Sequence, residues 1–208
     1  MKLKDIMIES LKLMFASYDR DLALASIDEL KADSAFRDYI YNMPPAINRA
    51  FGLIENKGVL RDVASIHIAS EGRMVIPDYI APTDGKLGGT VTRIGFKTSS
   101  GISWLSWDEI DFSNSEMVIP SAVPSAHYVI YYSPKIKRVT AETVEDTEIP
   151  IPDDVAALIP YYVKGELYRE EDASEADNAK AWFTAGLNEI VNRSIIPTGV
   201  STVYGGLI

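Results

Sequence analysis

The sequence contains no cysteine and only two histidines, His67 and His127. The absence of thiols excludes disulfides, thiolate nucleophiles and cysteine-ligated zinc or iron–sulfur sites. The two histidines lie far apart in strand-like surroundings, so we interpret each as a half-buried strand residue, because a lone imidazole specifies little. Chemistry based on these side chains is therefore not expected.

Long apolar runs are also missing. A helix that crosses a membrane needs about 20 predominantly apolar residues, and the chain has no such run. The N-terminal stretch "MKLKDIMIESLKLMF" carries acidic residues through its apolar part, which is unlike a signal peptide. We expect a soluble protein that is made in the cytosol and has no membrane partner.

Basic residues are few and scattered. The chain has 20 Lys and Arg against 30 Asp and Glu, for a net charge of −10. Residues 141–208 hold 4 of the basic and 13 of the acidic residues, so nearly all of the excess lies in the last third. Binding to nucleic acid requires clustered Lys and Arg, so the sequence argues against a surface that grips DNA.

Helical periodicity marks the first part of the chain. Apolar residues of 2–16 repeat at helical spacing, and a cleaner pattern runs from residue 36 to residue 54. Asp33 or Ser34 is placed to cap the second helix, and Gly58 to end it. Two prolines, Pro44 and Pro45, predict a kink or a restart within it. The stretch 19–30 between them is expected to form a short helix or a turn.

Helical patterns return near the C-terminus. One helix is expected from Asp153 or Asp154 onward, bent at Pro160 and Gly165. Another opens near Asp172 or Ser174, and its pattern places these residues inward: Ala176, Ala179, Trp182, Phe183, Leu187, Ile190 and Val191.

The middle of the chain changes to the period of β-strands. The expected strands are "VASIHIA", "RMVIPDYI", "TVTRIGFKT", "ISWLSW", "EMVIP", "HYVIYYS" and "KIKRVTA". They are rich in Val, Ile, Thr and aromatic residues and are separated by turn-forming stretches such as "PTDGKLGG" and "FSNS". Short strands at this spacing predict a small antiparallel sandwich or barrel. The stretch "TVEDTEIPIP" is expected to form an extended bridge out of it.

The order of helices, strands and helices predicts an α+β fold. Amphipathic helices need a partner for their apolar face, so we expect the N- and C-terminal helices to form one bundle, with an antiparallel β-sandwich or barrel module inserted between them. The expected domains are a discontinuous helical bundle of residues 1–58 and 150–193, a β-module of 59–149, and an extended C-terminal arm of 194–208.

Candidate chemistry is sparse. The stretch "GKLGG" at residues 85–89 lacks the spacing of a phosphate loop. In "WDEIDFSNSE", Ile110 and Phe112 stand where a calcium loop needs oxygen ligands. Five aromatic residues of the β-module offer a sugar-stacking platform or a core: Trp104, Trp107, Tyr128, Tyr131 and Tyr132. We expect a structural or binding protein rather than an enzyme, with no catalytic residue, cofactor or metal.

Two helical regions carry a resemblance to a known family. The run "IPDDVAALIPYYVKGELYREEDASEADNAKAWFTAGLNEI" resembles the C-terminal helices of tailed-phage head-to-tail adaptor (connector) and neck proteins, through Leu158 to Val163, the acidic turn of 170–175, and Ala179 to Phe183. The stretch "YNMPPAINRAFGLIENKGVL" is similar to their helix ahead of the β-region. The resemblance covers roughly two fifths of the chain, and the β-region contributes no motif.

The resemblance implies a structural virion protein. Such a subunit forms a homo-oligomeric ring, of twelve copies as the resemblance implies, that joins the portal protein to tail or neck proteins at the head-to-tail junction and lets DNA pass through its lumen without sequence-specific binding. It is made in the host cytoplasm.

The uncharged C-terminal arm is the expected partner-binding segment. Its binding residues are expected to be Ile195, Ile196, Val200, Val203, Tyr204, Leu207 and Ile208. The alternative is a tail-tip or baseplate protein whose β-module binds carbohydrate or a receptor.

Overall fold

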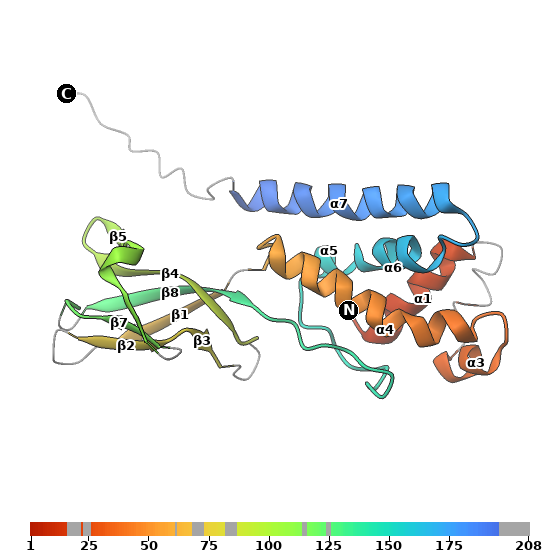
Figure 1. Cartoon of the computed structure of the whole chain (residues 1–208), viewed down its shortest axis with the longest axis horizontal. Coiled ribbons are helices and arrows are strands. Elements are labelled where there is room, and N and C mark those ends of the chain that lie inside the picture. The colour runs from red at the N-terminus through yellow and green to blue at the C-terminus, as the bar shows by residue number, and fades with distance from the viewer. Residues whose placement is uncertain are drawn as a thin grey trace, which may run out of the picture. The chain divides into compact units, whose positions relative to one another are not determined.

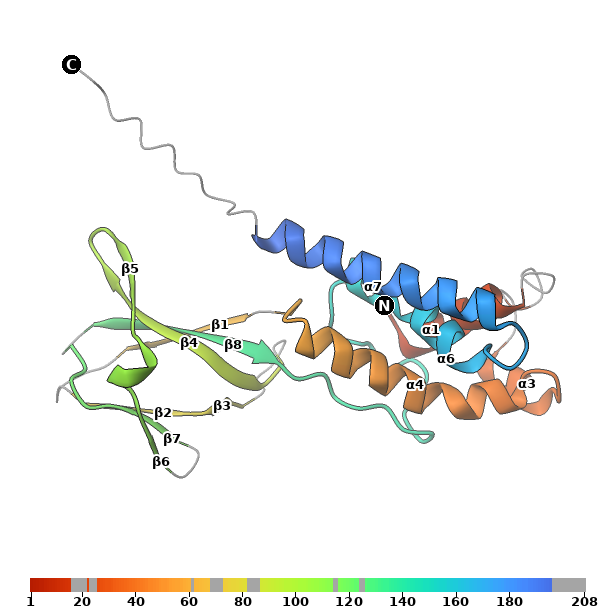
Figure 2. The same ribbon diagram turned by 45° about the horizontal axis from the view of Figure 1, so that its top comes forward.

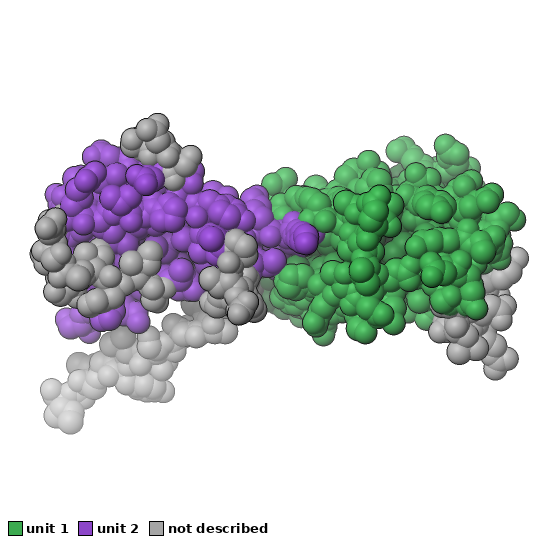
Figure 3. All heavy atoms as spheres, turned by 90° about the horizontal axis from the view of Figure 1, so that it is seen from below, with its two compact units in different colours: residues 1–59, 138–208 green, residues 60–137 purple. Residues whose placement is uncertain are grey.

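The computed structural model describes residues 1–15, 22, 26–60, 62–67, 73–81, 87–113, 116–123 and 126–195. It combines α-helices with antiparallel β-sheets, as expected for the fold class. The chain divides into two compact units, Met1–Val59 with Arg138–Ile208 and Leu60–Lys137, which Figure 3 colours separately. The second unit thus ends at residue 137, whereas the expected β-module extended to residue 149.

In the described residues, the N-terminal part of the first unit contributes the helices α1 (Leu3–Met14), α3 (Ile27–Ala32) and α4 (Arg37–Asn56). Ser26 caps α3, because its hydroxyl accepts a hydrogen bond from the Glu29 amide (3.2 Å) while the Glu29 carboxylate accepts one from the Ser26 amide (2.8 Å). Both α1 and α3 thus confirm the expected helical character of these stretches.

Helix α4 continues through Pro44 and Pro45 without a break, so the expected restart is wrong. Each proline lacks the amide hydrogen that would bond to the carbonyl four residues earlier. The helix is held instead by its buried face, to which Met43, Ala46 and Ile47 contribute. The expected cap at residue 33 or 34 is also absent from α4, because the Asp33 carboxylate accepts from the Ala35 amide (2.8 Å) ahead of the helix.

The C-terminal helices are α5 (Asp153–Ala156), α6 (Ile159–Leu167) and α7 (Ala173–Ile195). The expected single helix is divided at residues 157–158, just ahead of Pro160. Asp172 precedes α7 and accepts a hydrogen bond from the Glu175 amide (3.0 Å), as a capping residue does.

Helix α6 lies between α7 on one side and α1 and α4 on the other (Figures 1 and 2). Its Ile159 and Val163 are buried there, and the ring of Tyr162 lies 5.0 Å from that of Phe183 on α7. Helices from both ends of the sequence therefore share one apolar core.

The second unit contains strands β1 (Asp62–His67), β2 (Met74–Pro77), β3 (Tyr79–Ile80), β4 (Gly89–Thr98), β5 (Gly101–Trp104), β6 (Asp111–Ser113), β7 (Glu116–Ile119) and β8 (His127–Pro134). The larger sheet has the order β1-β8-β4-β3, with β5 paired to β4, and it curls into a half-barrel. The smaller sheet has the order β2-β7-β6. All of these strand pairs are antiparallel.

This second unit has its own core. Alternate residues of the strands point inward, as in β2, where Met74 and Ile76 are buried and Val75 is exposed. They pack with Ile130 and Tyr128, whose hydroxyl accepts a hydrogen bond from the Val123 amide (2.9 Å).

The expected strand "KIKRVTA" is wrong. Residues 135–141 form no strand, and from residue 138 the chain belongs to the first unit. The side chain of Asn48 in α4 forms hydrogen bonds with both the amide and the carbonyl of Val139. This stretch is therefore paired with a helix and not with a β-sheet. Strand β6, in contrast, falls partly in the stretch "FSNS" that was expected to be a turn.

Candidate functional site

The predicted binding segment lies almost entirely outside the described residues. Ile195 is the last residue of α7, so a segment beyond the helix begins at residue 196 and not at residue 194 as expected. The other six predicted residues, Ile196, Val200, Val203, Tyr204, Leu207 and Ile208, lie outside the described ranges.

The segments that carry the resemblance meet in the first unit. Glu166 of α6 pairs with Lys180 of α7 (2.6 Å) and with Arg49 of α4 (3.0 Å). Burial opposes the ionisation of Glu166, but the hydrogen bond and charge of Lys180, together with Arg49, outweigh it and lower its pKa. One carboxylate thus links the three helices.

The turn between α6 and α7 is strongly acidic. Glu171 accepts a hydrogen bond from the Tyr39 hydroxyl, and burial together with this carboxylate raises the pKa of Tyr39. Glu170 and Asp38 line the same shallow hollow of about 260 Å³. Within the described part of the chain, no group of three or more His, Asp or Glu side chains is arranged to hold a metal ion.

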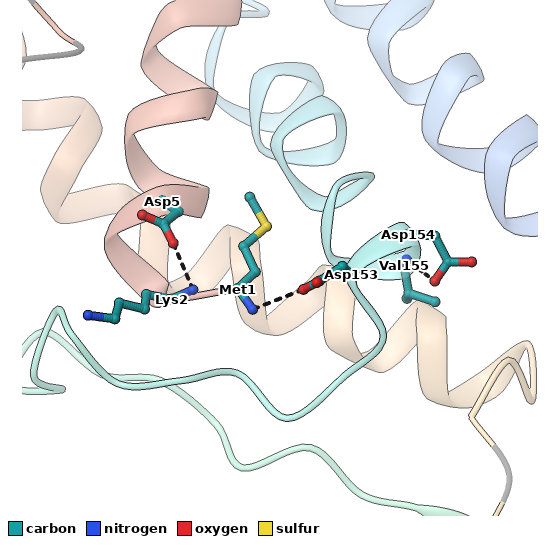
Figure 4. A network of polar contacts seen from close by, with 6 residues as sticks. All are labelled: Met1, Lys2, Asp5, Asp153, Asp154 and Val155. Carbon is teal, nitrogen blue, oxygen red and sulfur yellow. Dashed lines mark hydrogen bonds and ion pairs between the residues drawn. The ribbon is translucent and has the colours of Figure 1, made fainter.

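An irregular segment, residues 138–152, is bound at the start of α1. The amides of Leu3 and Lys4 donate to the carbonyls of Thr147 and Glu145 (both 2.9 Å). Asp153, at the end of this segment, accepts from the Met1 amino group (3.1 Å; Figure 4). The start of the chain is therefore fixed to a segment about 150 residues later.

Lysines of the first unit hold the same segment by charge. Asp146 pairs with Lys4 (2.8 Å) and Lys2 (3.0 Å), and the hydrogen bonds from these two lysines lower its pKa to about 2. Lys31 pairs with Glu145 (2.8 Å), which raises the pKa of the lysine.

A hollow of about 190 Å³ lies where this segment crosses α1 and α4. Its wall is largely apolar, with the Lys31–Glu145 pair as its charged part. The apolar lining residues are Leu3, Met7, Ile40, Tyr41, Pro44 and Ala141.

Helix α7 exposes a large aromatic side chain to one side of its buried stripe. Trp182 is 69% exposed, which contradicts its expected inward position. The stripe that α7 buries consists of Ala176, Ala179, Phe183 and Leu187. Trp182 lies on α7, and none of the residues that line the hollow comes from α7.

The aromatic residues of the second unit do not form one platform. Tyr128 and Tyr132 are buried in its core, and the Arg93 guanidinium lies 4.0 Å from the centre of the Trp104 ring. Trp107 is half exposed, and its ring lies 5.8 Å from that of the exposed Phe112. The exposed aromatic pair is therefore Trp107 with Phe112, a partner that the sequence pattern did not suggest.

The carboxylates beside this pair have local partners. Glu109 accepts from the Ser106 amide (2.8 Å), and a hydrogen bond from the Ser106 hydroxyl lowers the pKa of Asp108. These groups cap the short 3₁₀ helix of Trp107–Glu109, which accounts for two of the acids in the stretch that had suggested a calcium loop.

The two histidines are closer than their sequence separation suggested. The register of β1 with β8 places His67 opposite His127. Only the backbone pairing brings them together, and this could not be read from two isolated positions in the sequence.

No protein-family model matches the chain, and a comparison with curated proteins finds no match. Among the described residues, no helix has both the length and the apolar character that crossing a membrane requires.

Proposed function

We propose that the protein is a non-enzymatic structural component of a tailed-phage virion, a head-to-tail adaptor subunit. Copies of it form a ring, twelve in number as the resemblance implies, between the portal and the tail or neck proteins. One observation carries this proposal. The segments that resemble such adaptors lie in α4, α6 and α7. A complete β unit separates α4 from α6 and α7 in the sequence, yet α6 packs against α4 as well as against α7.

In this proposal the helices of the first unit form a bundle, and the second unit is a β-sandwich inserted into it. The insertion is supported by the separate core of residues 60–137 and by the return of the chain to α4 at Val139. The bundle supplies the contacts between neighbouring subunits, through two different faces, as a closed ring requires.

The charge distribution suits a channel for DNA. The acidic last third of the chain lines the lumen in this proposal, where negative charge repels phosphates and lets the duplex pass without sequence-specific binding. The protein is made in the host cytoplasm and is incorporated into the virion at the head-to-tail junction.

The segment after α7 binds the portal. Its residues 196–208 carry no charged side chain, and the apolar residues Val200, Val203 and Tyr204 can dock on a neighbouring chain as an added strand.

Phage particles test the function and the role of this segment separately. Phage produced without the protein should consist of heads and tails that are not joined. In wild-type phage, electron microscopy should show the protein as a ring at the head-to-tail junction. A chain truncated after Ile195 should keep its helical content but fail to join heads to tails. Normal joining by the truncated chain would refute the role of the segment, and absence of the protein from the junction would refute the function.

The exposed pair of Trp107 and Phe112 favours one second candidate, a tail-tip or baseplate protein that binds carbohydrate. Aromatic faces stack on sugars, and carboxylates such as Asp111 can accept hydrogen bonds from hydroxyl groups. A glycan array decides between the two functions. Saturable binding that is lost in Trp107→Ala supports this candidate, and an adaptor should bind no glycan.

A further inference from the structure

Residues 140–148, called the lid segment below, are attached to the first unit at their two ends. Val139 before the segment and Ile149 after it are buried apolar residues of the core. Between them, no side chain of the lid segment is buried. The segment therefore has fixed ends but no apolar face of its own that would hold its middle in place.

The lid segment forms one wall of the hollow of about 190 Å³. Thr140 and Ala141 line the hollow and are also exposed, so this wall lies on the solvent side. The inner wall consists of buried apolar side chains of α1 and α4, namely Leu3, Met7, Ile40 and Pro44. A movement of the lid segment away from the helices would uncover these side chains.

Two backbone hydrogen bonds join the lid segment to α1. The carbonyls of Thr147 and Glu145 accept from the amides of Leu3 and Lys4, which belong to the first turn of the helix (both 2.9 Å). Amides of a first turn have no partner within their own helix. Water can therefore replace these two carbonyls without loss of any hydrogen bond inside α1.

Ion pairs also hold the lid segment on the helices. Asp146 pairs with Lys4 (2.8 Å) and Lys2 (3.0 Å), and Glu145 pairs with Lys31 (2.8 Å). The side chains of Asp146, Lys2 and Lys4 are 62%, 50% and 39% exposed. Ion pairs in contact with water are weak, and dissolved salt screens them. Because hydrogen bonds from Lys4 and Lys2 lower the pKa of Asp146 to about 2, the carboxylate is ionised at neutral pH, where salt is the variable that weakens the pairs.

We propose that the lid segment opens away from the hollow as one piece when its ion pairs break, while α1 and α4 stay folded. Segments with few buried contacts open at a lower free energy than the core of a protein, so this opening precedes unfolding of the helices. Salt favours the open state. The lid segment thus controls access to an apolar hollow, and this inference does not depend on the proposed function.

The local hydrogen bonds fit movement as one piece. Two turns within the lid segment, at residues 140–143 and 144–147, are each closed by their own backbone hydrogen bond (3.1 and 2.9 Å). These bonds do not involve the helices and can persist in the open state. The hinges are the fixed ends at Val139 and Ile149.

A thiol placed in the hollow tests the opening in the full chain. The chain has no cysteine, so Met7→Cys puts the only thiol at the inner wall, where the native side chain is 4% exposed. Met43→Cys, which is buried in α4 but does not line the hollow, is the matched control and reports unfolding of the helices. With dithiodipyridine as the reagent, the Met7→Cys thiol should react at least about tenfold faster than the Met43→Cys thiol.

Salt and a second substitution test the role of the ion pairs. An increase of NaCl from about 0.05 M to about 1 M should speed the reaction of Met7→Cys at least about threefold and leave that of Met43→Cys unchanged. Added to Met7→Cys, Asp146→Asn should speed the reaction at low salt and reduce its response to salt, because it removes the pairs with two lysines. Asp111→Asn removes the same charge from the second unit and should have no effect.

Two results would overturn the proposal. Equal rates for the two thiols would show that the hollow opens only when the helices unfold. A Met7→Cys rate that responds neither to salt nor to Asp146→Asn would show that the ion pairs do not hold the lid segment.

Hydrogen exchange gives the same test in the unmodified chain, which covers the case in which a cysteine variant does not fold. The amides of Leu3 and Lys4, which donate to the lid segment, should exchange at least about threefold faster in high salt. Amides inside α4, such as that of Phe51, should keep their rates. An equal response of both groups to salt, or no response of either, would contradict the proposal.

Discussion

Asn48 fixes an irregular segment by pairing with both polar backbone groups of one residue. Its side chain donates to the Val139 carbonyl (2.7 Å) and accepts from the Val139 amide (2.9 Å). Asn48→Ala leaves two partly buried groups without their partner, so we expect the free energy of unfolding to fall by about 1–3 kcal/mol. Urea denaturation followed by circular dichroism at helical wavelengths measures this. Asn42→Ala, which removes an exposed bond within α4, is the control and should change it by less than about 0.5 kcal/mol.

Asp146 makes stability depend on acid pH. The pKa of its carboxyl is lowered to about 2 by Lys4 and Lys2, against an ordinary value near 3.9. The ionised form therefore stabilises the fold above about pH 4, and this contribution is lost as the pH falls toward 2. Asp146→Asn should flatten the fall in melting temperature between these pH values, with Asp111→Asn as a charge-matched control. An unchanged pH profile in Asp146→Asn would contradict the prediction.

Trp182 shows the limit of periodicity at the level of single residues. The helical pattern correctly placed Ala176, Ala179, Phe183 and Leu187 inside, but it also placed Trp182 there. Neighbouring positions on a helix differ by about 100°, and a helix that rests mainly on one other helix buries only a narrow stripe. The width of that stripe depends on the number of packing partners, which the sequence of α7 does not specify.

Close contact between helices α6 and α7 depends on Gly165. A Cβ atom added there would lie 2.4 Å from Cγ of Lys180, which can move, and 2.9 Å from the Ala176 carbonyl oxygen, which belongs to the backbone. Gly165→Ala should therefore destabilise the protein by about 1–3 kcal/mol, although alanine favours the helix itself. Gly52 of α4 has no atom within 4 Å of an added Cβ, and Gly52→Ala should stabilise by up to about 1 kcal/mol. Urea denaturation measures both, and equal effects of the two variants would refute the prediction.

Most elements could be predicted from the sequence, because the spacing of apolar residues and the capping residues depend on neighbours that are close in the sequence. The alternation in β2 and the capping residues of α3 are examples of such local signals. The prediction of a strand at residues 135–141 was wrong, because alternating apolar residues also occur in extended segments that are half buried but not part of a sheet. The partner of this stretch is α4 and not another strand.

The two units should be separable at the scale of the whole molecule. Arg138 pairs with Glu55 (2.9 Å), so the chain leaves and re-enters the first unit at neighbouring points. Replacing residues 60–137 with a short Gly/Ser linker should leave a folded helical protein, because the core of the first unit lies within that unit. Circular dichroism should show helical structure with a cooperative melt. A chain without a cooperative melt would show that the helices require the β unit.

The sequence by itself determined the location of the main helices and strands, the acidic last third, and the absence of thiol chemistry. These follow from periodicity, composition and charge, which are properties of local stretches. Only the tertiary structure decided that α6 packs against helices from both ends of the chain, that residues 138–152 are bound at the start of α1, and that Trp182 is exposed. Each of these features depends on contacts between residues far apart in the sequence. The apolar character of a side chain predicts that it is buried but does not specify which distant residue packs against it.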